Sequence, residues 1–153
     1  MEKPPELFDR EAEWSDLVAF TQQRGAGIRL ALVRGRRRQG KSFLLRRIAE
    51  ATGGFYLQAL EQERSQALDG LGRALGEYLA VPGGRLAFNG WDDALAALVQ
   101  LRRGNQPAVA VIDEFPYLLA HSPELPSRLQ RQSMLPETAG PPCAWSCAAP
   151  RSR

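Results

Sequence analysis

The chain has 153 residues, of which 44% are hydrophobic and 24% charged, and this composition suits one globular domain large enough to bury a core. Its net charge of +3 is too mild for a dedicated nucleic-acid binder. No apolar run reaches the roughly 18 residues of a membrane helix, and the N-terminus carries no apolar leader. We therefore expect a cytoplasmic protein without membrane partners. Two cysteines and one histidine are too few for a four-ligand zinc site.

The first two predicted elements are a helix over residues 11–24 and a strand over residues 28–33. Trp14, Leu17 and Val18 share one face of the helix, and its first turn carries acidic residues, which the helix dipole favours there. The strand is almost continuously apolar, which is typical of a strand covered on both faces. We therefore expect this strand in the interior of an α/β fold.

The most specific motif follows this strand directly. Residues 35–42 match the phosphate-binding pattern GxxxxGK(S/T), and the helical pattern that the motif requires follows over residues 41–52. The glycines let backbone N–H groups point at phosphate oxygens, and the helix N-terminus favours an anion. Lys41 is expected to contact the β- and γ-phosphates, and Ser42 to offer its hydroxyl to Mg²⁺. The residues predicted to bind ATP are Gly35, Arg36, Arg37, Arg38, Gln39, Gly40, Lys41, Ser42 and Phe43.

The middle of the chain alternates between predicted strands and helices. The expected elements are a strand over residues 55–60, helices over residues 65–80 and 91–102, and a strand over residues 108–112. Glycines at three positions should weaken the first of these helices, namely Gly70, Gly72 and Gly76. Together with the earlier elements, this order predicts an α/β, three-layer fold of the P-loop NTPase class around a parallel sheet.

An acidic pair, Asp113 and Glu114, follows the last of these strands. An apolar strand that ends in acidic residues is the Walker B pattern. Ligands of open α/β sheets bind outside the carboxyl ends of the strands, so Asp113 should lie near the phosphate loop. We predict that Asp113 holds Mg²⁺ together with Ser42, and that Glu114 orients or deprotonates the attacking water, with Lys41 as the second catalytic residue. Pro116 should end the strand.

Three segments together resemble the archaeal-type ATPase family, which belongs to the AAA+ superfamily and is related to the signal-transduction ATPases with numerous domains. They are F-x-R-E at Phe8–Glu11, the loop at Gly35–Ser42 and DEFPYL at Asp113–Leu118. The resemblance covers about residues 7–130 and implies a five-stranded ATPase core that uses ATP and Mg²⁺. Asp9 stands where the family usually has glycine.

The last part of the chain departs from this pattern. We predict a P-loop ATPase domain over residues 1–130, an incomplete AAA+ core, and an irregular or disordered tail over residues 131–153. The resemblance implies a sensor strand there, between the phosphate-loop strand and the Walker B strand. Reading the tail in another codon register recovers a similar strand, so we hypothesise a frameshift near Arg131. Without that strand we expect marginal stability, unless residues 143–149 form a makeshift strand between closely flanking prolines.

Three functions are consistent with these motifs. The first is a truncated ATP-binding switch that binds Mg-ATP and hydrolyses it weakly; it is an ATP hydrolase only if the missing sensor, arginine finger and lid are not required. The alternative is a small-molecule phosphotransferase on the same loop, although the adjacent Asp113 and Glu114 favour water as nucleophile. The third is a nucleic-acid-associated module built on the arginines at 34–47, which lack interleaved aromatic residues. Self-association or DNA binding is expected through regions absent from this chain.

Overall fold

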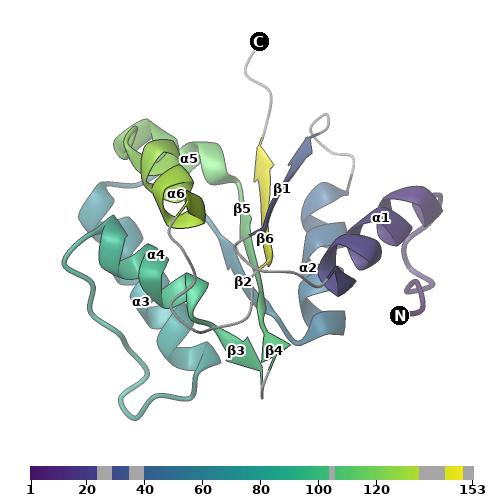
Figure 1. Ribbon diagram of the computed structural model, residues 1–153, viewed down its shortest axis with the longest axis horizontal. Coiled ribbons are helices and arrows are strands. Elements are labelled where there is room, and N and C mark those ends of the chain that lie inside the picture. The colour runs from purple at the N-terminus through teal and green to yellow at the C-terminus, as the bar shows by residue number, and fades with distance from the viewer. Residues whose placement is uncertain (24–28, 35–39, 104–105, 135–143, 150–153) are drawn as a thin grey trace.

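The computed structural model describes residues 1–23, 29–34, 40–103, 106–134 and 144–149, and it shows a mixed α/β fold (Figure 1). The helices are α1 (Glu11–Gln22), α2 (Lys41–Thr52), α3 (Arg64–Tyr78), α4 (Trp91–Val99), α5 (Phe115–His121) and α6 (Leu125–Met134). The strands are β1 (Arg29–Arg34), β2 (Phe55–Gln58), β3 (Arg102–Arg103), β4 (Gln106–Pro107), β5 (Val109–Asp113) and β6 (Ala144–Ala149). None of the helices in these ranges combines the length and the apolar character needed to cross a membrane.

Four strands form one parallel sheet in the order β1-β6-β5-β2, while β3 and β4 form a separate antiparallel pair. Helices cover both faces of this sheet, with α1 and α2 on one side and α3 to α6 on the other (Figure 1). The prediction of an α/β fold with a parallel sheet is therefore confirmed. All five residues of β5 are buried, as expected for a continuously apolar strand in the interior of a parallel sheet.

The side chains of β5 alternate between two hydrophobic clusters. Val109 and Val111 pack with residues of α1 and α2, whereas Ala110 and Ile112 pack with residues of α3 to α6. Because successive side chains of a strand point to opposite faces, Asp113 is on the same face as Val111. The last residue of β5 therefore directs its carboxylate to the α2 side of the sheet.

The tail is not irregular from residue 131 onward, so that prediction is wrong where the structure describes it. Helix α6 continues to Met134, and β6 lies between β1 and β5, where it pairs with both strands. The makeshift strand considered from the sequence is thus present, and the premise that β1 and β5 lose their shared partner is wrong. The other residues of the tail lie outside the described ranges, and the frameshift stays a hypothesis for the encoding DNA.

The segment after β5 also differs from the sequence interpretation, which expected no helix there. The strand ends already at Asp113, and Pro116 lies inside the first turn of α5. The N–H groups of a first helical turn have no intrahelical partner, so a proline there removes nothing that the helix needs. In α2, Ala49 is buried whereas Ala51 is exposed. Leu79 falls within the helix predicted over residues 65–80, but it is 44% exposed because α3 ends at Tyr78.

Two of the three glycines that should weaken α3 let the following loop lie directly on the helix. A Cβ added at Gly72 would lie 2.0 Å from the backbone oxygen of Leu86, and one at Gly76 would lie 2.6 Å from the backbone nitrogen of Arg85. The N–H of Leu86 donates to the carbonyl oxygen of Gly72 at 2.9 Å. These glycines therefore serve close backbone packing at the expense of helix propensity.

Gly72→Ala should destabilise the domain by about 1–3 kcal/mol, because the loop backbone would have to move away from the helix. Gly70→Ala is the matched control in the same helix, since its new methyl group would meet only Gln62 Nε2, at 3.6 Å. That control should stabilise the domain by up to about 1 kcal/mol through helix propensity. Equilibrium unfolding in urea measures both changes, and equal stability of the two variants would contradict the packing of the loop on α3.

Candidate functional site

Helix α2 begins at the sheet edge where the parallel strands end. Its N-cap is Gly40, with φ +68° and ψ 18°, a left-handed conformation that glycine adopts without steric cost. Lys41 and Ser42 form the start of the first turn, and helix N-termini favour anions. Residues 35–39 of the predicted phosphate loop lie outside the described ranges. The described part of the motif is thus a left-handed glycine followed directly by a helix N-terminus.

Asp113 is buried at the end of β5, with 1% of its surface exposed. Its Oδ2 accepts a hydrogen bond from the Tyr56 hydroxyl at 2.9 Å, and its Oδ1 accepts one from the backbone N–H of Glu114 at 2.9 Å. Buried charged groups require such partners. Burial first, and then the hydrogen bond to Asp113 and its charge, raise the pKa of Tyr56 to about 12. The Tyr56 hydroxyl therefore keeps its proton at neutral pH and donates a hydrogen bond to Asp113.

Glu114 combines two unusual features at the N-cap of α5. Its backbone is left-handed, with φ +55° and ψ 36°, a conformation that costs a non-glycine residue about 1–3 kcal/mol. Its Oε2 is buried and has no hydrogen-bond partner among the described residues. Backbone strain and an unsatisfied buried carboxylate oxygen both occur preferentially at functional sites. The left-handed turn also places the Glu114 N–H within hydrogen-bond distance of Asp113.

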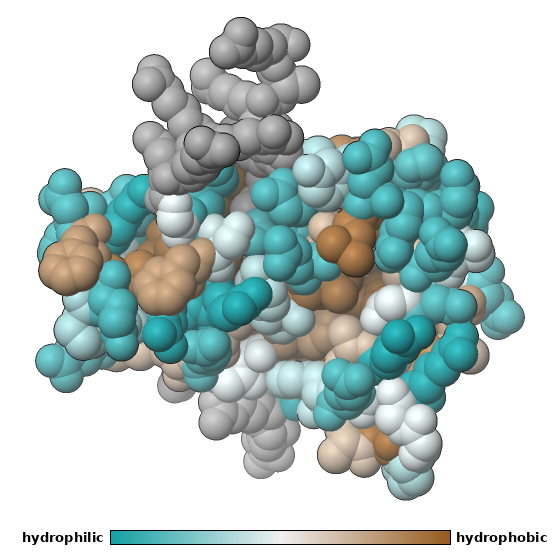
Figure 2. All heavy atoms as spheres, turned by 180° about the vertical axis from the view of Figure 1, so that it is seen from behind, coloured by the Kyte–Doolittle hydropathy of each residue, from teal (hydrophilic) through white to brown (hydrophobic). Residues whose placement is uncertain are grey.

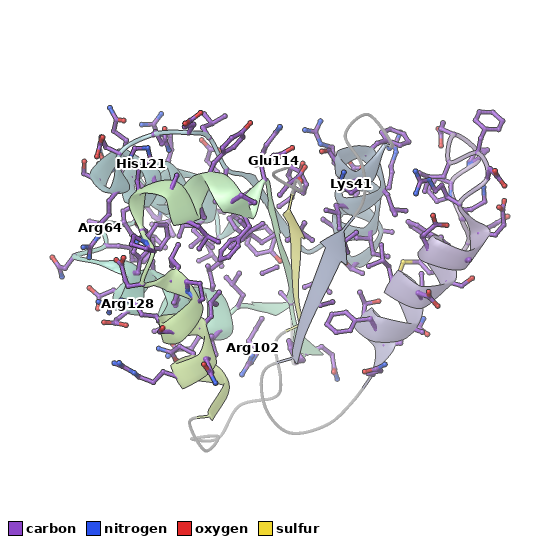
Figure 3. All side chains as sticks on the ribbon, turned by 90° about the horizontal axis from the view of Figure 1, so that it is seen from above. Lys41, Arg64, Arg102, Glu114, His121 and Arg128 are labelled. Atoms are coloured by element: carbon purple, nitrogen blue, oxygen red, sulfur yellow. The ribbon has the colours of Figure 1, made fainter. Side chains whose placement is uncertain are left out.

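The two motifs meet at one edge of the sheet. Seen from above, Lys41 and Glu114 lie at the same edge, on either side of the strands (Figure 3). Helix α2 packs against β5, and the carboxylate of Asp113 belongs to the face that α2 covers. Lys41 and Glu114, which are 73 positions apart in sequence, are thus found at the same edge of the sheet. The described members of the predicted site are Gly40, Lys41, Ser42, Phe43, Asp113 and Glu114.

The N-terminal segment lies against the same helix. Glu6 pairs with Arg47 of α2 at 3.9 Å, and the guanidinium carbon of Arg47 lies 4.9 Å from the ring centre of Phe43. Leu7 is buried in the cluster formed with α1 and α2. Asp9 has φ +52°, so it adopts the backbone conformation that glycine favours, at the position where the resemblance expects glycine. Asp9 therefore holds a left-handed backbone conformation that costs a non-glycine residue free energy.

The residues predicted to hold Mg²⁺ are Asp113 and Ser42, which carry oxygen ligands. Among the described residues, no three side chains of His, Cys, Asp or Glu form a group that could hold a metal ion. Mg²⁺ usually binds one or two carboxylates together with water and substrate phosphates. A carboxylate oxygen pair offers about four acceptor positions, of which Asp113 uses two. The Asp113 carboxylate and the Ser42 hydroxyl therefore suit Mg²⁺ that arrives with a nucleotide.

A separate hollow of about 430 Å³ lies between the end of β2 and α3. It has an apolar floor that includes Leu57, Leu71 and Leu118, and glutamine amides contribute to its lining. The face opposite to that of Figure 1 shows apolar surface at its centre, surrounded by hydrophilic side chains (Figure 2). Of the predicted site residues that the structure describes, none lines this hollow.

Sequence reasoning missed Tyr56 and Arg46. Tyr56 lies on β2, and its ring is 5.2 Å from the guanidinium carbon of Arg46 on α2. The pairing of Gln58 with Asp113 brings the end of β2 beside the end of β5. Tyr56 and Gln58 are two residues apart, so their side chains lie on the same face of β2. Strand alternation together with the strand order would therefore have placed Tyr56 on the same face of the sheet as Asp113.

A scan against protein-family models found no match to the chain, and a search of curated proteins found none either.

Proposed function

We propose that the chain binds Mg-ATP at the carboxyl edge of its sheet and acts as a P-loop nucleotide switch with weak hydrolysis. The observation that carries this proposal is the position of Asp113. An interior strand delivers its buried carboxylate to the face of α2, the helix that starts with Gly40-Lys41-Ser42. The sequence motif and the sheet topology independently support the same binding edge.

Each residue has a physical role in this proposal. The first-turn N–H groups of α2 and the ammonium group of Lys41 bind phosphate oxygens, while Ser42 and Asp113 hold Mg²⁺. The metal, when bound, neutralises charge on the β- and γ-phosphates. Glu114 has a buried, unpaired Oε2 that can accept a proton from water. In this proposal the start of α2 binds the phosphates, Asp113 at the end of β5 helps to bind the metal, and Glu114 serves hydrolysis.

The strand order also supports the resemblance to archaeal-type ATPases of the AAA+ superfamily. In that family a strand lies between the phosphate-loop strand and the Walker B strand, and β6 occupies this position between β1 and β5. We therefore propose a P-loop NTPase core of this type. The cytoplasmic location stays a prediction.

Isothermal titration with Mg-ATP tests the binding site directly. Lys41→Ala should bind Mg-ATP about 10- to 100-fold more weakly than the unmodified chain, because charged hydrogen bonds to phosphate contribute about 1.5–3 kcal/mol. Arg73→Ala is the matched control, since Arg73 is an exposed cation on α3 and lies on the other side of the sheet. Equal affinity of the unmodified chain and Lys41→Ala would reject this site.

A further inference from the structure

Three side chains from different elements form a connected series that ends at the proposed metal ligand. Arg46 of α2 lies over the ring of Tyr56 at 5.2 Å, and Tyr56 of β2 donates its hydroxyl hydrogen to Oδ2 of Asp113 at 2.9 Å. The Asp113–Tyr56 hydrogen bond joins residues 57 positions apart. Neither Arg46 nor Tyr56 belongs to the phosphate-loop or Walker B motif. The series therefore adds side-chain contacts that the two motifs do not explain.

We propose that Tyr56 is a positioning residue, which fixes the Asp113 carboxylate in the orientation that Mg²⁺ requires, and that Arg46 in turn holds the Tyr56 ring. This assignment rests on the proposed function, because it concerns the same metal-binding carboxylate. Tyr56 itself does not touch the metal or the nucleotide in this proposal. It acts through Asp113.

The chemistry of Mg²⁺ makes the orientation of this carboxylate important. Mg²⁺ demands near-octahedral coordination at about 2.0–2.1 Å, so a carboxylate that rotates binds it poorly. Oδ1 of Asp113 accepts a hydrogen bond from the backbone N–H of Glu114, directly after β5, and Oδ2 accepts one from the Tyr56 hydroxyl on β2. Two further acceptor positions remain for the metal or its water ligands. Partners that orient a ligating group typically change metal affinity about 10- to 100-fold.

A purely structural role for the Tyr56 hydroxyl predicts a different result. In that case the hydroxyl would only satisfy the buried carboxylate, and its removal would lower stability without changing the metal dependence of nucleotide binding. Tyr78 provides the comparison, because its hydroxyl donates to the backbone oxygen of Gly53 at the same distance of 2.9 Å. Both tyrosines are partly buried, but the Tyr78 hydroxyl bonds a backbone carbonyl and not Asp113.

Tyr56→Phe in the full chain tests the proposal, because it keeps the ring and its contact with Arg46. ATP affinity is measured by calorimetry at increasing Mg²⁺ concentration, in parallel with Ca²⁺, and without divalent metal. The Mg²⁺ concentration that gives half of the full increase in ATP affinity should rise about 10- to 100-fold. Affinity for metal-free ATP should stay within about twofold, because phosphate contacts are unchanged. The shift with Ca²⁺ should be smaller, because its coordination geometry is flexible.

Tyr78→Phe is the matched control and should leave the Mg²⁺ dependence unchanged, while thermal unfolding reports any loss of stability in either variant. Arg46→Gln changes an exposed side chain and leaves the hydrophobic core intact. It should raise the required Mg²⁺ concentration by about 2- to 5-fold, because that corresponds to the free energy of an exposed cation–π contact. An unchanged Mg²⁺ requirement in Tyr56→Phe, or an equal shift in Tyr78→Phe, would overturn the assignment while Mg-ATP binding itself stands. If the unmodified chain showed no Mg²⁺-dependent ATP binding, the proposed function would fall, and this assignment with it.

Discussion

Removal of β6, by ending the chain at residue 143, should abolish the cooperative unfolding transition of the domain. Strand β6 pairs with β1 from Ala144 to Ala149 and with β5 from Ala144 to Cys147, so it is the shared partner of two strands. Its loss would leave backbone N–H and C=O groups unpaired on both neighbours, and each buried orphan costs about 1–3 kcal/mol. A domain has only about 5–15 kcal/mol of total stability, so a few orphans suffice to unfold it.

A chain that ends at Ala149 is the matched control, because it keeps every paired residue of β6. Urea unfolding followed by circular dichroism should show one transition for this control and none for the chain that ends at residue 143. A full-length Ser146→Pro variant should behave like the shorter chain, since proline cannot donate within a central strand. A cooperative transition with an unchanged m-value in the chain lacking β6 would show that the sheet closes without it.

The elements with clear hydrophobic periodicity were predicted well from the sequence. Helix α2 has the predicted bounds of Lys41–Thr52, and Gly53 ends it in a left-handed conformation at φ +59°. Strand β5 follows from an uninterrupted apolar run. In each of these cases local propensity and the final environment agree, so the pattern alone is sufficient.

Strand β6 could not be predicted in the same way. Its sequence AWSCAA has no clean alternation, and the positions around it are rich in proline. It is a strand because it fills the gap between two strands whose backbone groups need partners, and such tertiary context outweighs intrinsic strand propensity. Helix α5 was missed for a different reason. Pro116 was interpreted as the end of a strand alone, although proline also starts helices.

The motif residues of the site were predictable, but their supporting residues were not. Lys41, Ser42, Asp113 and Glu114 follow from spacing within two short segments. Tyr56 supports Asp113 across 57 positions, and the contact depends on the neighbouring places of β2 and β5 in the sheet. No local pattern encodes such a contact, because it arises from the strand order. The left-handed backbone of Glu114 likewise has no signal in a residue type that rarely adopts it.

Glu114→Gln should reduce ATP hydrolysis by about 10²- to 10⁴-fold, the contribution of a general base, while Mg-ATP affinity changes little. Glutamine keeps the shape of the side chain but cannot accept a proton from water at neutral pH. Single-turnover hydrolysis and calorimetry on the same preparation separate the two effects. Glu77→Gln, an exposed change on α3, is the matched control and should leave both quantities unchanged.

A third variant, Glu114→Gly, connects this role with the strained backbone. Glycine adopts φ +55° without steric cost, so this variant should resist urea at least as well as the unmodified chain although it lacks the carboxylate. Lost hydrolysis together with unchanged or higher stability is the trade-off expected when a strained residue is kept for catalysis. Hydrolysis at the full rate in Glu114→Gln would remove Glu114 from the mechanism. If the chain bound Mg-ATP without any turnover, the proposed nucleotide binding would stand, but the hydrolytic role of Glu114 would be contradicted.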